Sequence, residues 1–136
     1  MIWVQGLPIA QGSKNAFNRG GRIVLVESAK GLKSWRETIA HVAGLQGREV
    51  SSEAIKLTLL FCMPAPKKMV RKAPTTKPDL DKLARAVLDA LTGVWYVDDS
   101  QVVALDLQKV YTWAEPGVYL SIQAIDNSLI TTRKNV

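Results

Sequence analysis

Sulfur and histidine are scarce in this sequence. Cys62 and His41 are the single cysteine and the single histidine among 136 residues. Because Cys62 lies inside an apolar run, Leu57–Met63, we expect a buried core thiol rather than a disulfide framework or a catalytic cysteine. With no second histidine and no cysteine partner, His41 is expected on a helix surface. A metal or catalytic site built from cysteine and histidine is therefore not expected.

Long hydrophobic runs are absent as well. No apolar stretch approaches the ~20 residues that a membrane-spanning helix requires. Gln5, Gly6 and Pro8 interrupt the first apolar residues, which argues against a signal peptide. The hydrophobic content of 47% still supports a real core. We expect one compact cytoplasmic domain over residues 1–125, a polar and flexible tail over 126–136, and neither a membrane partner nor a small-molecule cofactor.

Acidic residues are fewer than basic ones and unevenly placed. The chain has 18 Lys and Arg against 12 Asp and Glu, a net charge of +6. Thirteen basic and four acidic residues lie in the segment up to Lys77, whereas six acidic residues lie between Asp79 and Asp106. Lys and Arg can hold a phosphate backbone, and gathered carboxylates can hold a metal ion. The distribution favours a nuclease over a protein whose charges are merely solvated.

The acidic residues surround the best helix pattern in the chain, within Lys77–Gln101 (KPDLDKLARAVLDALTGVWYVDDSQ). Pro78 suits the start of a helix, and Gly93 suits its end. Between them, apolar residues recur at the spacing of a helix packed on a core: Leu80, Leu83, Ala84, Val87, Leu88 and Leu91.

Asp79 and Asp81 can be arranged in two ways at the start of this helix. If both are helical, their side chains lie about 200° apart around the axis and cannot share a ligand. If the chain stays extended through Asp79 and becomes helical near Asp81, both can point to one place. Lys77 precedes a proline and is biased toward the extended region, which suits the second geometry. An N-capping or solvated role is the alternative for each aspartate alone.

A second acidic pair, Asp98 and Asp99, follows the apolar run Val94–Val97 and precedes a strand-like segment. A helix start and a strand start could bring the two pairs together. Carboxylates gathered in that way repel one another unless a cation holds them. The four aspartates are therefore candidate metal ligands.

Three ordered motifs resemble the signature of the RusA-type endonucleases, which resolve Holliday junctions and are common in phages and prophages. They are KPDLDKL, LDALTGV and DDSQV. The segments GLPIAQGSKNAF and GGRIVLVESAKGLKSWRETIA are also similar to the amino-terminal half of phage-borne members. The resemblance extends from about Trp3 to about Ile125.

The resemblance implies a homodimeric, Mg²⁺-dependent nuclease, with Mn²⁺ able to substitute, in the cytoplasm of a bacterial host. It assigns metal binding to Asp79, Asp81 and Asp99, with Asp98 in support. Arg85 stands where the family usually has a catalytic lysine, and Lys82 where it often has asparagine. Arginine can stabilise a phosphate charge but does not readily lose a proton, so Arg85 is a poor general base.

Two polar segments are candidate contacts to the DNA backbone. One is a glycine-rich loop over Gln11–Gly21, and the other is Pro64–Lys77, which contains three prolines, five cations and no acid. A plain surface loop or a solvated linker is the alternative for each. The candidate DNA-binding residues are Lys14, Arg19, Lys67, Lys68, Arg71, Lys72, Lys77 and Lys82.

The predicted fold is α/β (α+β), a small mixed sheet covered by two helices in the order β-β-α-β-α-β-β. The first helix follows Ser28 and ends near Gly44 or Gly47. Along the strand predicted over Gln101–Trp113 and the residues just before it, alternate side chains are expected on one side: Asp99, Gln101, Val103, Leu105, Leu107 and Lys109. Lys109 is expected at an edge or in solvent rather than near the metal ligands. The five predicted strands are Met1–Leu7, Arg22–Glu27, Ala54–Met63, Gln101–Trp113 and Gly117–Ile125.

These observations together predict an endonuclease that resolves a four-way junction by paired nicks, with water as the nucleophile. Two other readings of the same residues stay open. One is a basic DNA-binding protein without catalysis, in which the aspartates cap a helix. The other is a nuclease for flaps or other branched DNA. An enzyme for small phosphorylated substrates is less favoured, because the sequence has no glycine-rich phosphate cradle.

Overall fold

The computed structural model describes residues 1–12, 14–19, 22–27 and 30–125, and only the backbone of the described residues between 13 and 29. The central element is a mixed sheet of β1 (Ile2–Gln5), β4 (Ile55–Pro64), β5 (Val102–Thr112) and β6 (Gly117–Ala124). Their order in the sheet is β1-β6-β4-β5. Strand β4 pairs parallel with β5 and antiparallel with β6, which also pairs antiparallel with β1. The mixed sheet predicted from the sequence is confirmed.

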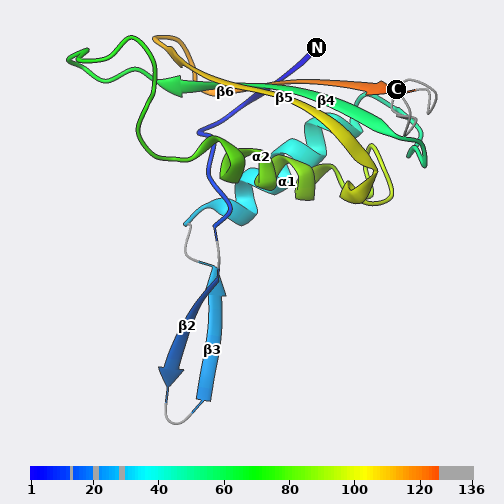
Figure 1. Ribbon diagram of the computed structural model, residues 1–136, viewed down its shortest axis with the longest axis horizontal. Helices are drawn as coiled ribbons and strands as arrows, with labels where there is room; N and C mark the ends of the chain where they lie inside the picture. Colours follow the sequence, from blue (N-terminus) through cyan, green and yellow to red (C-terminus); the bar gives the residue numbers. More distant parts are fainter. Residues whose placement is uncertain (13, 20–21, 28–29, 126–136) are drawn as a thin grey trace, which may run out of the picture.

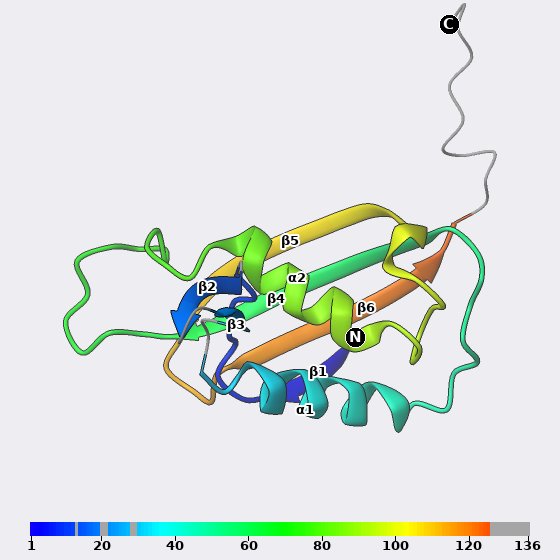
Figure 2. The same cartoon turned by 90° about the horizontal axis from the view of Figure 1, so that it is seen from below.

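Two helices, α1 (Leu32–Gly44) and α2 (Leu80–Leu91), cover one face of this sheet in the described part of the chain (Figures 1 and 2). The core lies between them and alternate residues of β4, such as Leu57, Leu59 and Phe61, each at most 1% exposed. The predicted helix spans are confirmed. Gly93 follows α2 with a φ of 81°, a left-handed conformation that glycine adopts without a steric cost.

The predicted element order is confirmed except for one additional strand. The segment predicted as a loop over Gln11–Gly21 contains β2 (Lys14–Arg19), which pairs antiparallel with β3 (Arg22–Glu27). These strands form a two-stranded sheet of their own, which projects from the helices rather than joining the main sheet (Figure 1). The sequence of β2, KNAFNR, is mostly polar. It lacks the apolar alternation that marks a strand packed on a core.

The segment before β5 also differs from the prediction. Asp99–Gln101 forms a short 3₁₀ helix, η1, so β5 begins only at Val102. The register between β4 and β5 shifts at Val103, which has no partner in β4, so the expected alternation does not include Asp99, Gln101 or Val103. From Leu105 it holds as predicted, and Lys109 is the register partner of Phe61, on the side of the sheet that the helices cover. None of the helices described here is long and apolar enough to cross a membrane.

Candidate metal and DNA-binding site

The start of α2 has the second of the two geometries considered for Asp79 and Asp81. Asp79 is extended (φ −70°, ψ 140°) and serves as the N-cap residue, whereas Asp81 lies in the first helical turn. The side chain of Asp79 makes no capping hydrogen bond to the helix. Both aspartates are exposed. Among the described side chains, one ion pair involves them, between Lys82 Nζ and Asp79 Oδ2 at 3.7 Å. Their carboxylates are therefore free to bind a ligand from solvent.

Lys109 holds the backbone that leads into this helix. Its Nζ donates hydrogen bonds of 2.8 Å to the carbonyl oxygens of Thr76 and Pro78. The peptide bond between Lys77 and Pro78 is cis. The side of β5 predicted for Lys109 is confirmed, but the expected edge or solvent position is wrong, because a strand pattern does not show which distant loop crosses that side.

The second half of α2 is tied to the first helix through Gln11. The Gln11 Nε2 atom donates to Asp89 Oδ2, and Arg36 Nη1 donates 2.8 Å to Gln11 Oε1. The Gln11 backbone N–H also donates to the carbonyl oxygen of Lys82 at 3.0 Å. The aspartate of the LDALTGV motif therefore takes part in packing the helices together.

Asp98 and Asp99 lie in a turn that Gln101 organises. Gln101 Oε1 accepts from the backbone N–H groups of Val97 and Asp98, and its Nε2 donates to the carbonyl oxygens of Ser51 and Glu53, all at 2.9 Å. The side chain of Asp98 completes the turn by accepting from Ser100 N–H at 3.3 Å. The glutamine of the DDSQV motif is thus a structural residue that links the turn to the segment before β4.

The two carboxyls of this turn have opposite pKa shifts. Hydrogen bonds from the Ser100 backbone and from the Asp99 side chain lower the pKa of Asp98. Desolvation raises the pKa of Asp99, and the hydrogen bond shared with Asp98 and the charges of Asp98 and Asp89 raise it further. Adjacent carboxyl groups affect each other in this way, because the negative charge of one disfavours ionisation of the other. Asp99 is the carboxyl of this turn that would gain most from a bound cation.

The two acidic pairs are not brought together within one chain. Asp99 senses the charge of Asp89, ten residues after Asp79 along α2. At 1.5 Å per residue this separates the two ends of the helix by about 15 Å. In Figure 2, η1 lies toward the opposite end of the sheet from the start of α2. Among the described residues, no three acidic, cysteine or histidine side chains gather closely enough to hold a metal ion.

The predicted basic residues lie around the start of α2. Arg85 is exposed one turn after Asp81, and Lys82 is half-buried beside Asp79. The segment between β4 and α2 has neither helix nor strand, as predicted, and its five cations are exposed: Lys67, Lys68, Arg71, Lys72 and Lys77. Lys14 and Arg19 are the terminal residues of β2, and their side chains are outside the described residues.

Comparisons with known proteins agree with this arrangement. The family model of the endodeoxyribonuclease RusA matches residues 5–123. An uncharacterized protein of Bacillus subtilis (strain 168), YqaN, is 34% identical in an alignment of 135 residues that covers 90% of this chain and 94% of that protein. The match includes both helices, strands β4 and β5, and all four aspartates. This chain belongs to the RusA endodeoxyribonuclease family.

Proposed function

We propose that this protein is a Mg²⁺-dependent, structure-selective endodeoxyribonuclease that resolves Holliday junctions by paired symmetric nicks. The observation that carries the proposal is the exposed pair of Asp79 and Asp81 at the start of α2, directly after a basic segment, in a member of this family. We further propose that it acts in the cytoplasm of a bacterial host and is encoded by a phage or prophage.

The carboxylate pair suits magnesium. Mg²⁺ prefers oxygen ligands and is usually bound by one or two carboxylates together with waters and substrate phosphates. Asp79 and Asp81 provide such oxygens, and neither is consumed by helix capping. When bound, the ion would lower the pKa of a water and stabilise the charge that develops on the phosphate; Mn²⁺ could substitute for it. Lys82 and Arg85 are placed to neutralise the phosphate as donors only.

Asp99 would join this site from a second copy of the chain. In one chain it lies near the other end of α2, so it cannot complete the set in place. Strand β5 pairs only with β4 among the described strands, and exposed apolar side chains lie on it and just before it. They are Val97, Val103 and Leu105, which are 61%, 49% and 44% exposed. A two-fold contact through this edge would bury them and carry each Asp99 toward the partner.

A two-fold dimer would also match its substrate. A four-way junction has approximate two-fold symmetry, so two identical sites could nick opposing strands. The basic segment between β4 and α2 would hold the backbone near each site, which selects the shape of the DNA more than its sequence.

Cleavage of a labelled synthetic four-way junction tests the proposal. Wild-type protein with Mg²⁺ should make paired nicks on the junction and none on linear duplex, and EDTA or Asp81→Asn should abolish them. Binding without cleavage at any Mg²⁺ or Mn²⁺ concentration would instead identify a non-catalytic DNA-binding protein. Equal cleavage of flaps would identify a nuclease for branched DNA in general.

Mixing two inactive variants tests whether Asp99 is supplied by the second copy of the chain. A heterodimer of Asp79→Asn and Asp99→Asn has one site with both substitutions and one fully intact site only if Asp99 is contributed by the partner. Each heterodimer should then show about half of the nicking activity of a wild-type dimer, because one of its two sites is intact. If each chain supplied its own Asp99, both sites of the heterodimer would be damaged and no activity would return.

A further inference from the structure

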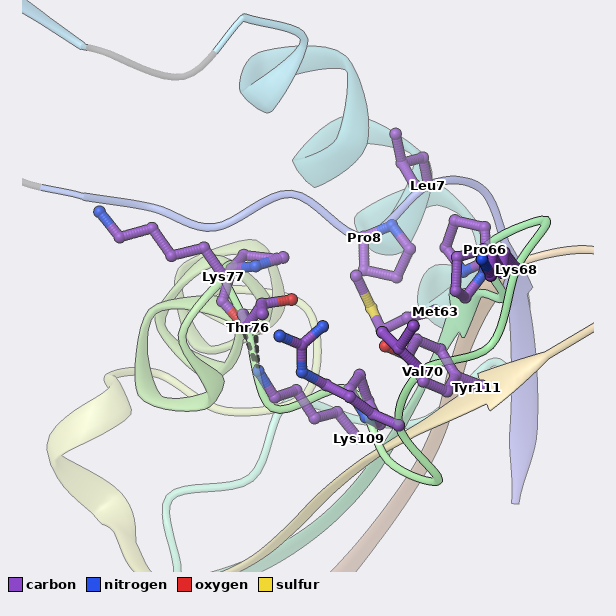
Figure 3. Close-up of a pocket in the computed structure, with 14 residues that line it drawn as sticks. Leu7, Pro8, Met63, Pro66, Lys68, Val70, Thr76, Lys77, Lys109 and Tyr111 are labelled. Atoms are coloured by element: carbon purple, nitrogen blue, oxygen red, sulfur yellow. Dashed lines mark hydrogen bonds between the residues drawn. The ribbon is translucent and has the colours of Figure 1, made fainter.

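A cavity of about 420 Å³ lies beside the candidate metal site (Figure 3). The segment between β4 and α2 forms one side of it, and β4, β5 and the residues after β1 form the other. Of the described residues that line it, none is acidic. The lining residues are Leu7, Pro8, Met63, Pro64, Pro66, Lys68, Val70, Arg71, Pro74, Thr76, Lys77, Pro78, Lys109 and Tyr111.

The lining combines an apolar surface with cations. Pro8, Met63 and Pro74 are buried, and the aromatic ring of Tyr111 is half-buried beside them. Lys68, Arg71 and Lys77 are exposed at the cavity, where their charges can reach a bound group. A phosphate alone would leave the apolar surface without a partner, and a purely apolar ligand would leave the cations without one. The occupant therefore has a flat or apolar part and an anionic part.

Lys109 adds directed hydrogen bonding to the cavity. Two of its three N–H groups are used by the carbonyl oxygens of Thr76 and Pro78, which leaves one donor. Arg71 also offers only donors. These two side chains therefore suit an occupant that presents hydrogen-bond acceptors, such as the carbonyl oxygens and ring nitrogens of nucleobases.

The position of the cavity indicates where its occupant comes from. Pro78 lines the cavity, and Asp79 is the next residue in the chain. The wall of the cavity at Pro78 is therefore one residue, ~3.8 Å along the backbone, from Asp79, the first of the two aspartates proposed to meet the scissile phosphate. A nucleotide next to the cut fits both conditions, because its base supplies the flat part and its phosphates supply the charge.

We propose that this cavity binds one unstacked nucleobase of the junction, next to the phosphate that is cut, and thereby contributes to the choice of cleavage position. The proposal rests on the proposed function. The base would stack against Tyr111 or Arg71 and accept a hydrogen bond from Lys109, while Lys68 and Lys77 hold the neighbouring phosphates. Distorted junctions supply such bases at low cost, since the strands at the crossing are already partly unstacked.

A set of four-way junctions, each with one abasic site near the crossing, tests the proposal by equilibrium binding in EDTA. When the abasic site replaces the bound base, at one position on each cut strand, wild-type protein should bind the junction about tenfold more weakly than the intact junction. This is the effect expected for the loss of one stacked base. Val70→Trp should erase that difference to less than about twofold, because the larger side chain occupies the cavity. Val70 is 70% exposed, so the variant should fold.

Met69→Trp is the matched control. Met69 is the preceding residue, is also exposed, and does not line the cavity. Met69→Trp adds the same aromatic side chain to the same segment, so the difference in affinity between intact and abasic junctions should persist. Equal binding to all abasic junctions by the wild type would overturn the proposal, and so would a difference that survives Val70→Trp.

Cleavage assays keep this result separate from the proposed function. If intact junctions are nicked with Mg²⁺ but no abasic position matters, the cavity proposal is wrong and the nuclease proposal stands. If one abasic position matters but no junction is ever nicked, the cavity binds a base in a protein that is not a resolvase.

Discussion

A pair of aspartates lies near each end of α2, and the two pairs differ in their exposure and their hydrogen bonds. At the start of the helix, Asp79 and Asp81 are exposed and make no capping hydrogen bond. Near its end, Asp98 caps η1, and the turn that holds Asp99 is fixed by four hydrogen bonds of Gln101. The first pair is exposed and contributes little to folding, whereas in the second pair Asp98 is part of the turn that holds Asp99 in place.

The difference shows that pairs of aspartates close together in sequence can have different roles, according to the hydrogen bonds that each side chain makes. A carboxylate that already accepts protein hydrogen bonds is stabilised in place and has less to gain from a ligand. A carboxylate without such hydrogen bonds, whose ion pair is solvent-exposed as that of Asp79 with Lys82 is, keeps most of its affinity for a cation. Substitutions at the two ends should therefore separate activity from stability, and four changes test that contrast.

The largest effect is expected for Asp79→Ala. If Asp79 binds the metal as proposed, its loss should reduce junction cleavage on the order of 10³-fold, since metal ions supply several kcal/mol of transition-state stabilisation. The free energy of unfolding, measured in urea, should change by less than about 1 kcal/mol, because no capping hydrogen bond is lost. Asp106→Ala, at an exposed position on the uncovered face of β5, is the control and should keep both properties.

Gln101→Ala should mainly affect the stability of the fold. The substitution removes four hydrogen bonds and leaves partners in a partly buried turn, which should lower the free energy of unfolding by about 2–3 kcal/mol. Urea denaturation measures it. Gln108→Ala, at an exposed position of β5, should change it by less than about 0.5 kcal/mol. An unchanged free energy of unfolding for Gln101→Ala would show that the turn does not depend on this side chain.

Lys109→Met tests how the backbone before Asp79, at the start of α2, is held in place. It removes the two hydrogen bonds to Thr76 and Pro78 while keeping most of the side chain's volume, so stability should fall by about 1–2 kcal/mol. Cleavage should fall about tenfold, because the backbone that presents Asp79 is less fixed. Lys56→Met, on the opposite face of the sheet, is the control for loss of a lysine charge. Unchanged cleavage would mean that Asp79 is positioned by other contacts.

Tyr96→Phe should have the smallest effect at neutral pH, about 1 kcal/mol, from loss of the 2.6 Å hydrogen bond to the Leu88 carbonyl oxygen. Burial raises the pKa of Tyr96 far above its usual value, and the charge of Asp99 raises it further. Since the folded state holds this proton more tightly, the stability it provides is complete below about pH 10 and is lost as pH rises above that value. Wild-type stability should therefore fall more steeply than that of Tyr96→Phe between about pH 10 and 12. Parallel curves would contradict the burial of this hydroxyl.

Several features of the fold could be predicted because they are encoded locally. The apolar spacing from Leu80 to Leu91 gives the span of α2, and Gly93 marks its end. The apolar run from Ile55 to Met63 gives the interior strand β4. Strand β2 could not be predicted in this way, because its polar residues pair with β3 outside the core and leave no apolar alternation.

The sequence by itself determined the two helices, the five predicted strands and the excess of cations before α2, because each follows from neighbouring residues and their spacing. It left two arrangements open for Asp79 and Asp81, and the structure shows which one holds. Only the tertiary structure decided that Gln101 spans from η1 to Ser51, that Lys109 holds the backbone before Asp79, and that the two acidic pairs lie at opposite ends of α2. These depend on contacts between residues 30 to 50 positions apart, whose geometry is set by the packing of the helices on the sheet.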